Sequence, residues 1–278
     1  MSDLHQSNMY ANFMREIGWA VDGDPGTQIF FRKLGPLSIA KYQRPNSIDY
    51  DRLAQFRRDH HTLTTYIEPG FGYNQARPKF SFAVDPFAHS MTSLVDLNPS
   101  ISTILSAFTQ KTRYNITRNT KKNLIQVKTV SLSNLSSSQS QEFIDLHDAW
   151  SKQKHVLGYP MYILKGIIKS FANSGDLHLC YHGSELIGSL LILYHDSVAT
   201  YYAAFASPLG YTTFAPTLLT WTAMTVAKQK DCHTFDFGGI YDPRYKKMYK
   251  KWVGFTKFKS GFNPTVVEYP PTTLQLFW

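Results

Sequence analysis

The order of hydrophobic and polar positions alternates along the chain between a helical and an extended pattern. Segments with one apolar face predict helices at residues 9–17, 50–60, 100–108, 112–120, 138–152, 162–173 and 215–229. Short runs rich in β-branched and aromatic residues predict strands at residues 28–31, 37–42, 62–67, 125–130, 177–181, 186–194, 198–204, 233–237, 256–260 and 266–269. Helices and strands that interleave in both halves favour an α/β or α+β fold over a helical bundle or a β-sandwich.

The serine-rich stretch at residues 134–141 is the most linker-like part of the sequence. A chain of 278 residues has room for one large domain or two modest ones. We therefore expect two domains, residues 1–125 and 126–278, with the last strand of the chain packing back on the first domain.

Composition limits the class of protein. Hydrophobic residues make up 43% of the chain and aromatic residues 15%, which excludes a mainly disordered chain. The amino terminus lacks the basic and apolar regions of a signal peptide, and the longest apolar run, Leu186–Tyr194, is far shorter than the roughly 20 residues of a spanning helix. We expect a cytoplasmic protein, with peripheral contact at the inner membrane face left open. Cys180 and Cys232 lie far apart without metal-ligand spacing, so we expect neither a disulfide framework nor a metal site.

Basic residues outnumber acidic ones by 29 to 20, and the resulting net charge of +9 predicts an anionic partner. Two runs contain basic residues and no acid: six basic residues lie between Lys111 and Lys128, and seven between Arg244 and Lys259. A single run of this kind is usually a solvated helix face. Two such runs, far apart in the sequence, favour an anion-binding surface.

Aromatic residues interleave with lysines in the second run, at residues 244–252, which we call the basic segment. A helix over Tyr245–Trp252 would place Lys247 and Lys251 on one face, with Lys246 and Lys250 beside them. The lysines would then contact phosphates in a salt-sensitive, sequence-independent way. The same helix would turn three side chains toward the core as an apolar stripe: Tyr245, Met248 and Trp252.

A family resemblance rests on eight short parts of the sequence, in this order: Leu4–Ser7 with Met9–Phe13, Arg44-Pro45, Thr92–Leu97, Lys111–Ile116, Tyr201-Tyr202, Pro216–Trp221, Phe235–Ile240 and Gly254–Phe262. Together they resemble the FemA/FemB/FemX family of peptidoglycan bridge-forming aminoacyltransferases over nearly the whole chain. The resemblance implies two tandem GNAT-like domains (the acyl-CoA N-acyltransferase type), each a mixed sheet flanked by helices. The sequence has no segment with the length or heptads of the family's coiled-coil arm, and its shortness implies a trimmed first domain.

The resemblance also implies an activity. Such enzymes transfer an amino acid from an aminoacyl-tRNA to an amine of the stem peptide of a peptidoglycan precursor, either lipid-linked or nucleotide-linked, and so form interpeptide bridges. No metal or other cofactor is implied, because the aminoacyl-tRNA is itself the co-substrate. Transfer from an ester to an amine is downhill, so positioning and stabilisation of the oxyanion would provide most of the catalysis.

Lys259 is the first candidate for a catalytic group, because it matches the lysine of the family's late Phe-Lys pair. On the expected strand at residues 256–260, Phe258 and Lys259 would face opposite ways, so Lys259 could reach the ester while Phe258 contacts a substrate. The alternative for Lys259 is an exposed lysine at a sheet edge. Asp96 is the second candidate: it could orient the incoming ammonium or accept its proton, or it could instead cap the helix expected near Ser100.

Candidate substrate-binding residues are spread over both halves. Tyr201 and Tyr202 follow each other on one strand, so only one can face the substrate while the other joins the core. Arginine and lysine side chains suit phosphate oxygens, which makes three residues candidates for the precursor's phosphates: Arg44, Lys41 and Lys33. The expected contacts with tRNA are Lys246, Lys247, Lys250 and Lys251, together with Arg113 of the first basic run.

Two other functions fit parts of the sequence. An acetyl-CoA-dependent N-acetyltransferase would share the fold, but such enzymes usually bind pyrophosphate in a glycine-rich loop at a helix start. The corresponding segment, Ser207–Thr213, contains one glycine and a proline and makes a poor cradle. A non-enzymatic module that binds tRNA or an anionic surface would explain the charge but not the Phe258-Lys259 pair.

Overall fold

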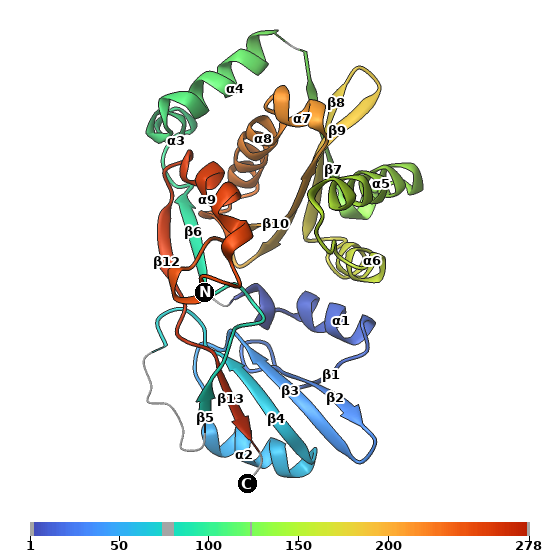
Figure 1. Cartoon of the computed structure of the whole chain (residues 1–278), viewed down its shortest axis with the longest axis vertical. Coiled ribbons are helices and arrows are strands. Elements are labelled where there is room, and N and C mark those ends of the chain that lie inside the picture. The colour runs from blue at the N-terminus through green and yellow to red at the C-terminus, as the bar shows by residue number, and fades with distance from the viewer. Residues whose placement is uncertain (1–2, 74–80, 123, 277–278) are drawn as a thin grey trace. The chain divides into compact units, whose positions relative to one another are not determined.

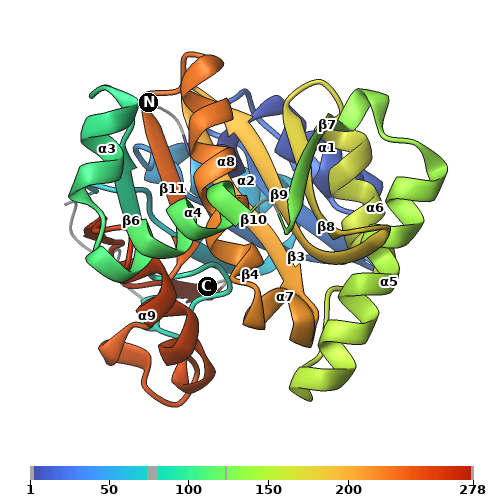
Figure 2. The same cartoon turned by 90° about the horizontal axis from the view of Figure 1, so that it is seen from above.

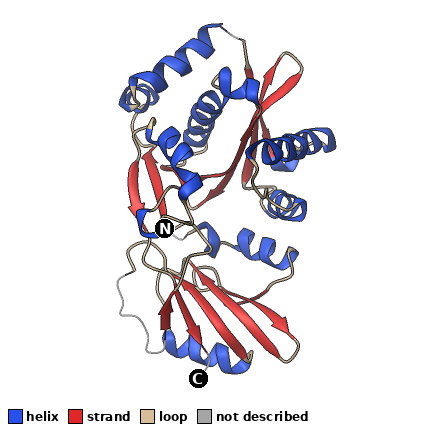
Figure 3. Ribbon diagram, viewed as in Figure 1, coloured by secondary structure: helices blue, strands red, loops and turns tan. Residues whose placement is uncertain are grey.

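The chain forms two compact units in the computed structural model, which describes residues 3–73, 81–122 and 124–276 (Figure 1). The first unit comprises Met1–Thr92, Gly239–Lys251 and Val266–Trp278, and the second comprises Ser93–Gly238 and Trp252–Thr265. Two mixed β-sheets flanked by helices confirm the predicted fold class (Figure 3). The boundary expected between residues 125 and 126 falls within the second unit.

The first unit is built on a six-stranded sheet in the order β1-β2-β3-β4-β13-β5. β3 and β4 run parallel, and the other neighbouring strands are antiparallel. β13 lies between β4 and β5, so the end of the chain completes this sheet. The strands are β1 (Ala20–Asp22), β2 (Ile29–Leu34), β3 (Leu37–Gln43), β4 (Thr62–Glu68), β5 (Ser81–Ala83) and β13 (Thr273–Leu276).

Two helices cover opposite faces of this sheet. Phe30 and Phe31 follow each other on β2 and therefore point to opposite faces. Tyr10 of the first helix contacts the Phe30 ring at 5.6 Å, and Phe56 of the second contacts the Phe31 ring at 5.5 Å. The helices are α1 (Asn8–Glu16), capped by Ser7, and α2 (Tyr50–Asp59), capped by Asp49.

Asp242 and Arg244 join the three parts of the first unit. The buried Asp242 carboxylate accepts hydrogen bonds from the Ser90 hydroxyl and from the amide and guanidinium of Arg244. Arg244 donates in turn to the carbonyls of Ser90, at 2.9 Å, and Tyr269, at 3.1 Å. Burial alone would raise the pKa of Asp242, but the hydrogen bonds from Arg244 and Ser90 outweigh it and lower the pKa.

Replacing Asp242 with alanine is expected to destabilise the protein by about 2–3 kcal/mol, because charge-assisted hydrogen bonds are lost and the Ser90 hydroxyl loses its acceptor. Unfolding in urea measures the change in the free energy of unfolding. The control is Asp85→Ala, which removes an exposed aspartate of the same unit and should change stability by less than about 0.5 kcal/mol. Equal stability of the two variants would show that Asp242 does not hold the unit together.

A seven-stranded sheet in the order β12-β6-β11-β10-β9-β8-β7 lies chiefly in the second unit. β10 and β11 run parallel, while β7 to β10 form an antiparallel series. Its strands are β6 (Met91–Asp96), β7 (Gln126–Ser131), β8 (Gly175–His182), β9 (Glu185–His195), β10 (Val198–Ala206), β11 (Thr234–Gly239) and β12 (Thr265–Glu268).

Helices cover both faces of this sheet: α4 and α8 lie on one face and α5 and α6 on the other (Figures 1 and 2). Cys180 and Cys232 are buried free thiols within the core under α8. Among the described residues, no helix combines the length and the hydropathy needed to span a bilayer. The helices are α3 (Ile101–Ala107), α4 (Gln110–Lys122), α5 (Ser137–Lys154), α6 (Met161–Ser170), α7 (Pro208–Thr212), α8 (Ala215–Gln229) and α9 (Val253–Ser260).

Two parts of the second basic run fold differently from the prediction. The helix expected over Tyr245–Trp252 is wrong, because the basic segment forms two short 3-10 helices, Pro243–Tyr245 and Lys250–Trp252, with turns between them. The apolar stripe also differs from the prediction. Met248, expected to face the core, is 44% exposed, and Tyr249, which was not part of the stripe, is 1% exposed. The strand expected at residues 256–260 is also wrong, because these residues belong to α9.

Candidate functional site

The candidate site lies where the parallel strands β10 and β11 stop pairing. Their ladder covers three pairs, the last of which joins Thr200 and Asp236. Just beyond it, the pairing of β10 with β9 shifts register after Tyr201, and an irregularity of this kind bends a strand. On β11, Gly238 has a φ of 66°, a left-handed conformation that glycine adopts without strain. The Phe237 carbonyl therefore lies past the end of the parallel ladder.

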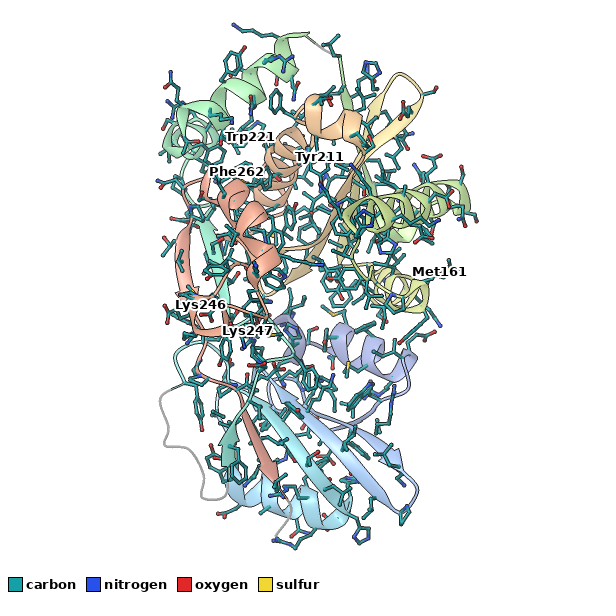
Figure 4. All side chains as sticks on the ribbon, viewed as in Figure 1. Met161, Tyr211, Trp221, Lys246, Lys247 and Phe262 are labelled. Carbon is teal, nitrogen blue, oxygen red and sulfur yellow. The ribbon has the colours of Figure 1, made fainter. Side chains whose placement is uncertain are left out.

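Lys259 of α9 reaches this point. Its ammonium donates a hydrogen bond to the Phe237 carbonyl at 2.7 Å and lies over the rings of Tyr201, at 5.4 Å, and Phe255, at 5.2 Å. Only 6% of the lysine is exposed. Phe262, just after the helix, contacts the Phe237 ring at 5.3 Å and so fixes the end of α9 against β11 (Figure 4).

Burial lowers the pKa of Lys259 to about 8, and the nearby Asp236 carboxylate opposes this shift. The side chain is therefore mostly protonated at pH 7, but it loses its proton more readily than an exposed lysine. An ammonium can donate three protons, and the Phe237 carbonyl uses one of them. Shielded from water, such a cation stabilises a nearby oxyanion more strongly than it would at the surface. The alternative of an exposed edge-strand lysine is wrong, because Lys259 is buried and helical.

The lowered pKa gives Lys259 a measurable effect on stability. In the unfolded chain this lysine titrates near 10.5, so between about pH 8 and pH 10.5 the unfolded state binds more protons than the folded state. The free energy of unfolding should therefore gain a contribution from Lys259 as the pH rises through this window. We expect the stability of the wild-type protein, relative to Lys259→Met, to increase from below pH 8 to about pH 10 in urea unfolding. A relative stability that does not change with pH would contradict the lowered pKa.

Tyr201 and Tyr202 have different surroundings, as expected for neighbours on a strand. Tyr201 lies beside Lys259 and contacts the Phe237 ring at 5.9 Å, and burial raises its pKa. Tyr202 instead stacks on Tyr159, with ring centroids 6.2 Å apart. The structure thus brings Tyr201 to the candidate site and leaves Tyr202 on the other face of the sheet.

Phe258 anchors α9 to the core. It is half-buried, packs against the core cluster and contacts the Phe262 ring at 5.4 Å. Phe258 and Lys259 still point in different directions, but for a different reason from the predicted one, since successive residues of a helix lie about 100° apart around its axis.

Asp96 ends β6 in a turn. Its exposed carboxylate accepts hydrogen bonds from the Asn98 amide, at 2.9 Å, and from the Asn98 side chain, at 2.7 Å. The helix cap that was one expectation for Asp96 is provided by Ser100, whose hydroxyl accepts a hydrogen bond from the Thr103 amide. The cap assignment is therefore wrong.

The structure does not bring Asp96 to Lys259. Leu97 donates to the His233 carbonyl just before β11, whereas Lys259 donates to the Phe237 carbonyl, four residues further along the chain. Four residues of strand span about 13 Å. Asp96 and Lys259 thus lie at opposite ends of β11, too far apart to act together on one bond.

Arg44 is enclosed within the first unit. It is 2% exposed, donates to the carbonyls of Pro69, at 3.1 Å, and His89, and its guanidinium lies 3.5 Å from the centre of the Tyr269 ring. A guanidinium with these partners stabilises the unit. Contact with a precursor's phosphates, as the sequence suggests, would require this part of the unit to open.

Lys41 and Lys33 lie on neighbouring strands in unlike surroundings. The Lys41 ammonium lies over the rings of Trp19, at 4.7 Å, and Phe87, at 4.5 Å. Burial lowers the pKa of Lys41, and Glu68 opposes that shift. Lys33 is exposed near the turn between β2 and β3, opposite Ser38. The structure therefore does not join these lysines into one phosphate site.

The lysines of the basic segment all face solvent: Lys246, Lys247, Lys250 and Lys251. Figure 4 labels Lys246 and Lys247 on this segment. Arg113 is engaged elsewhere, because its guanidinium donates to the carbonyls of Ser106, at 3.0 Å, and Phe108 at the end of α3. It therefore closes the carboxyl end of a helix, where a cation is favourable.

Sequence reasoning missed the main-chain acceptor of the site, the Phe237 carbonyl. No residue type marks such a group, but the glycines that follow, Gly238 and Gly239, were a usable signal. Glycines at a strand end often mark a break in the ladder or a close approach of two backbones. A Cβ at Gly238 would lie 3.1 Å from the Tyr201 carbonyl oxygen, which is such an approach.

The segment before α8 does not fit the pyrophosphate of an acyl-CoA in the usual binding mode, which requires outward-pointing, unbonded amides. Two amides of this segment donate to Ser207: the Gly210 amide to its hydroxyl and the Tyr211 amide to its carbonyl. Gly210 is required by packing, since a Cβ there would lie 2.0 Å from the Ile187 carbonyl oxygen. Four amides donate to partners within the segment itself: Gly210, Tyr211, Thr213 and Phe214.

Comparisons with known proteins identify the fold. A family model described as an acetyltransferase (GNAT) domain matches residues 110–247. The crystal structure of FemX matches with a TM-score of 0.77 and 14% identity, covering 99% of this chain and 92% of FemX. The C-terminal domain of a protein provisionally described as a lysylphosphatidylglycerol synthetase, from Agrobacterium fabrum, matches with a TM-score of 0.68 and 13% identity, covering 99% and 89%. A tandem GNAT protein of the clavulanic acid pathway matches with a TM-score of 0.54 and 8% identity, covering 93% and 78%. No curated protein matches by sequence.

These likenesses show the fold: two GNAT-like domains in tandem, each a mixed sheet flanked by helices. The described residues contain no coiled-coil arm of paired long helices. At 8–14% identity, the likeness to these solved structures concerns the fold alone.

Proposed function

We propose that this protein is an aminoacyltransferase that moves an amino acid from an aminoacyl-tRNA to an amine on the stem peptide of a peptidoglycan precursor. The observation that carries the proposal is the buried Lys259 ammonium at the end of the β10–β11 ladder, with a pKa lowered to about 8. The GNAT-type fold and the structural likeness to FemX support acyl transfer as the reaction class.

The reaction requires one strong hydrogen-bond donor to the oxyanion and few other catalytic groups. The acceptor amine attacks the ester carbonyl, a carbon–nitrogen bond forms, and the carbonyl oxygen becomes an oxyanion. The Lys259 ammonium donates a hydrogen bond to this oxyanion. The intermediate then collapses: the carbon–oxygen bond to the tRNA ribose breaks, the nitrogen loses a proton, and the ribose oxygen takes one up.

The donor is more consistent with an aminoacyl-tRNA than with an acyl-CoA. The amides of Gly210, Tyr211, Thr213 and Phe214 are already bonded within their own segment, which removes the usual pyrophosphate cradle. One structural relative is named for a lipid that carries lysine, which supports an amino acid as the transferred group. No step needs a metal or another cofactor.

The exposed lysines of the basic segment are the proposed contacts with tRNA. Lys246, Lys247, Lys250 and Lys251 lie within six residues that contain no acid, so they can follow a phosphate backbone without reading its sequence. Charged tRNA and the nucleotide-linked or lipid-linked acceptor meet in the cytoplasm, which is where we place the reaction.

Mass analysis of the product tests this function. The purified protein is incubated with a lysine-containing muropeptide and either charged tRNA or acetyl-CoA. We expect the muropeptide to gain the mass of an amino acid residue, and only with charged tRNA. A product formed only with acetyl-CoA would replace the proposal by an N-acetyltransferase, and tight tRNA binding without product would favour a non-enzymatic module.

A further inference from the structure

The connection between α5 and α6, residues 152–162, is a loop of exposed apolar side chains that we call the α5–α6 loop. None of its residues is buried. The exposed fractions are 104% for Leu157, 43% for Tyr159, 47% for Met161 and 61% for Tyr162. Figure 4 shows Met161 on the outer side of α6, away from the sheet. Tyr159 stacks on Tyr202, but the other three side chains lie exposed within six residues and mark an interaction surface.

The base of the loop is fixed, so the exposure of its tip is part of the fold. His155 has a φ of 50°, a left-handed conformation that ends α5 and turns the chain. Gly158 is pressed against α5, because a Cβ there would lie 2.3 Å from the Ser151 hydroxyl oxygen and 2.4 Å from the His147 ring. With its surroundings held in this way, Leu157 is kept in solvent.

Lysines flank the apolar tip. Lys152 and Lys154 are exposed at the end of α5. Lys165 is exposed on α6 four residues after Met161, on the same side of the helix. The sequence contains no acidic residue at positions 149–175. This stretch therefore combines exposed hydrocarbon with positive charge, and the nearest acid before it in the sequence, Asp148, is paired with His147.

We propose that the α5–α6 loop docks the protein on an anionic phospholipid surface. Leu157 and Met161 enter the acyl boundary, Tyr162 lies at the level of the headgroups, and the lysines contact headgroup phosphates. This is a binding property beyond the proposed function, because it needs neither tRNA nor a transfer reaction.

Two other kinds of partner fit these observations less well. A specific protein–protein interface usually takes about 20–30 residues on each partner, more than this one loop, residues 152–162, contains. An RNA would be held by the lysines and would leave Leu157 and Met161 in water. Only a lipid surface uses both the aliphatic side chains and the charge around them.

Co-sedimentation with vesicles tests the proposal. We expect the protein to bind vesicles of phosphatidylglycerol and phosphatidylcholine in equal parts, and to bind vesicles of phosphatidylcholine alone far less. The double variant Leu157→Asp, Met161→Asp should lower binding by about 30-fold or more, since two buried apolar side chains are replaced by charges. The control is Leu124→Asp, which changes an exposed leucine of the same unit and should bind like the wild type.

The contribution of the lysines to vesicle binding is tested separately with the double variant Lys152→Gln, Lys165→Gln. Each lysine near an anionic surface contributes about fivefold in binding, so this variant should lose roughly 25-fold. Its matched control, Lys121→Gln, Lys128→Gln, removes two exposed lysines elsewhere in the second unit and should lose much less.

Three results would overturn the proposal. The first is equal binding to both vesicle types. The second is an equal loss of vesicle binding in the loop variants and in their controls. The third is a loss of tRNA binding in the loop variants with unchanged vesicle binding, which would assign the loop to RNA. Because the assay contains no substrate, a failure here leaves the proposed transferase untouched, and a failure to detect transfer leaves the vesicle result unchanged.

Discussion

The variant Lys259→Met is expected to transfer an aminoacyl group about 10²–10³ times more slowly than the wild-type protein. Methionine fills much of the buried space between the rings of Tyr201 and Phe255, but it cannot donate to an oxyanion. The Phe237 carbonyl loses its donor, at a cost of about 1–3 kcal/mol in stability. Single-turnover transfer from charged tRNA measures the rate, and urea unfolding verifies that the variant is folded.

The matched control is Lys257→Met. Lys257 lies on the same helix two residues earlier, and it is exposed. Its loss removes the same charge from α9 without touching the Phe237 carbonyl, so the rate should stay within about twofold. If folded Lys259→Met protein transfers as fast as Lys257→Met protein, Lys259 has no part in the chemistry.

Neutralising the four lysines of the basic segment together is expected to weaken aminoacyl-tRNA binding by roughly 10²-fold or more at about 0.1 M salt. Each phosphate contact releases counterions, and the affinity falls with salt in proportion to their number. The slope of log affinity against log salt should therefore become shallower by about 3. Filter binding across a salt series measures both quantities. The changed residues are Lys246, Lys247, Lys250 and Lys251, each replaced by glutamine.

A second set of four lysines provides the control. Lys152, Lys154, Lys165 and Lys169 are exposed around the α5–α6 loop, and replacing them with glutamine lowers the net charge by the same amount. This variant should keep most of its tRNA affinity and lose its vesicle binding. Equal loss of tRNA affinity in both variants would mean that the overall charge, and not the basic segment, attracts the tRNA.

Most helices and strands could be predicted from the sequence because their apolar positions follow one period over many residues. The run predicted as a strand at residues 186–194, for example, is β9 with one more residue at each end. Three short strands, β1, β5 and β13, were not predicted, whereas β12, which is as short as β13, was. The three missed strands have too few residues to establish a period, and they exist because a neighbouring strand pairs with them.

α9 shows how a local pattern can mislead. Residues 256–260 were predicted as a strand from a short window that contains one β-branched and one aromatic residue, Thr256 and Phe258. Over a longer window, Phe255, Phe258 and Phe262 are spaced by three and four residues, which is the helical period. A window extended to Phe262 would have predicted the helix.

The candidate site was only partly predictable. Lys259 could be proposed from the family resemblance, but its burial and its main-chain partner depend on where α9 lies against β11. Arg44 is indistinguishable in the sequence from a surface cation such as Lys33. Its ring partner, Tyr269, comes from the far end of the chain, and no local pattern encodes that contact.

The position of β13 has a consequence for synthesis of the protein. β13 separates β4 from β5 and is synthesised long after both of them, so β5 has no place beside the rest of this sheet until residues 273–276 emerge from the ribosome. The second unit, whose parts end at Thr265, can be assembled before then. Removing β13 would therefore leave a gap between β4 and β5, in a sheet whose other strands come from the first part of the sequence.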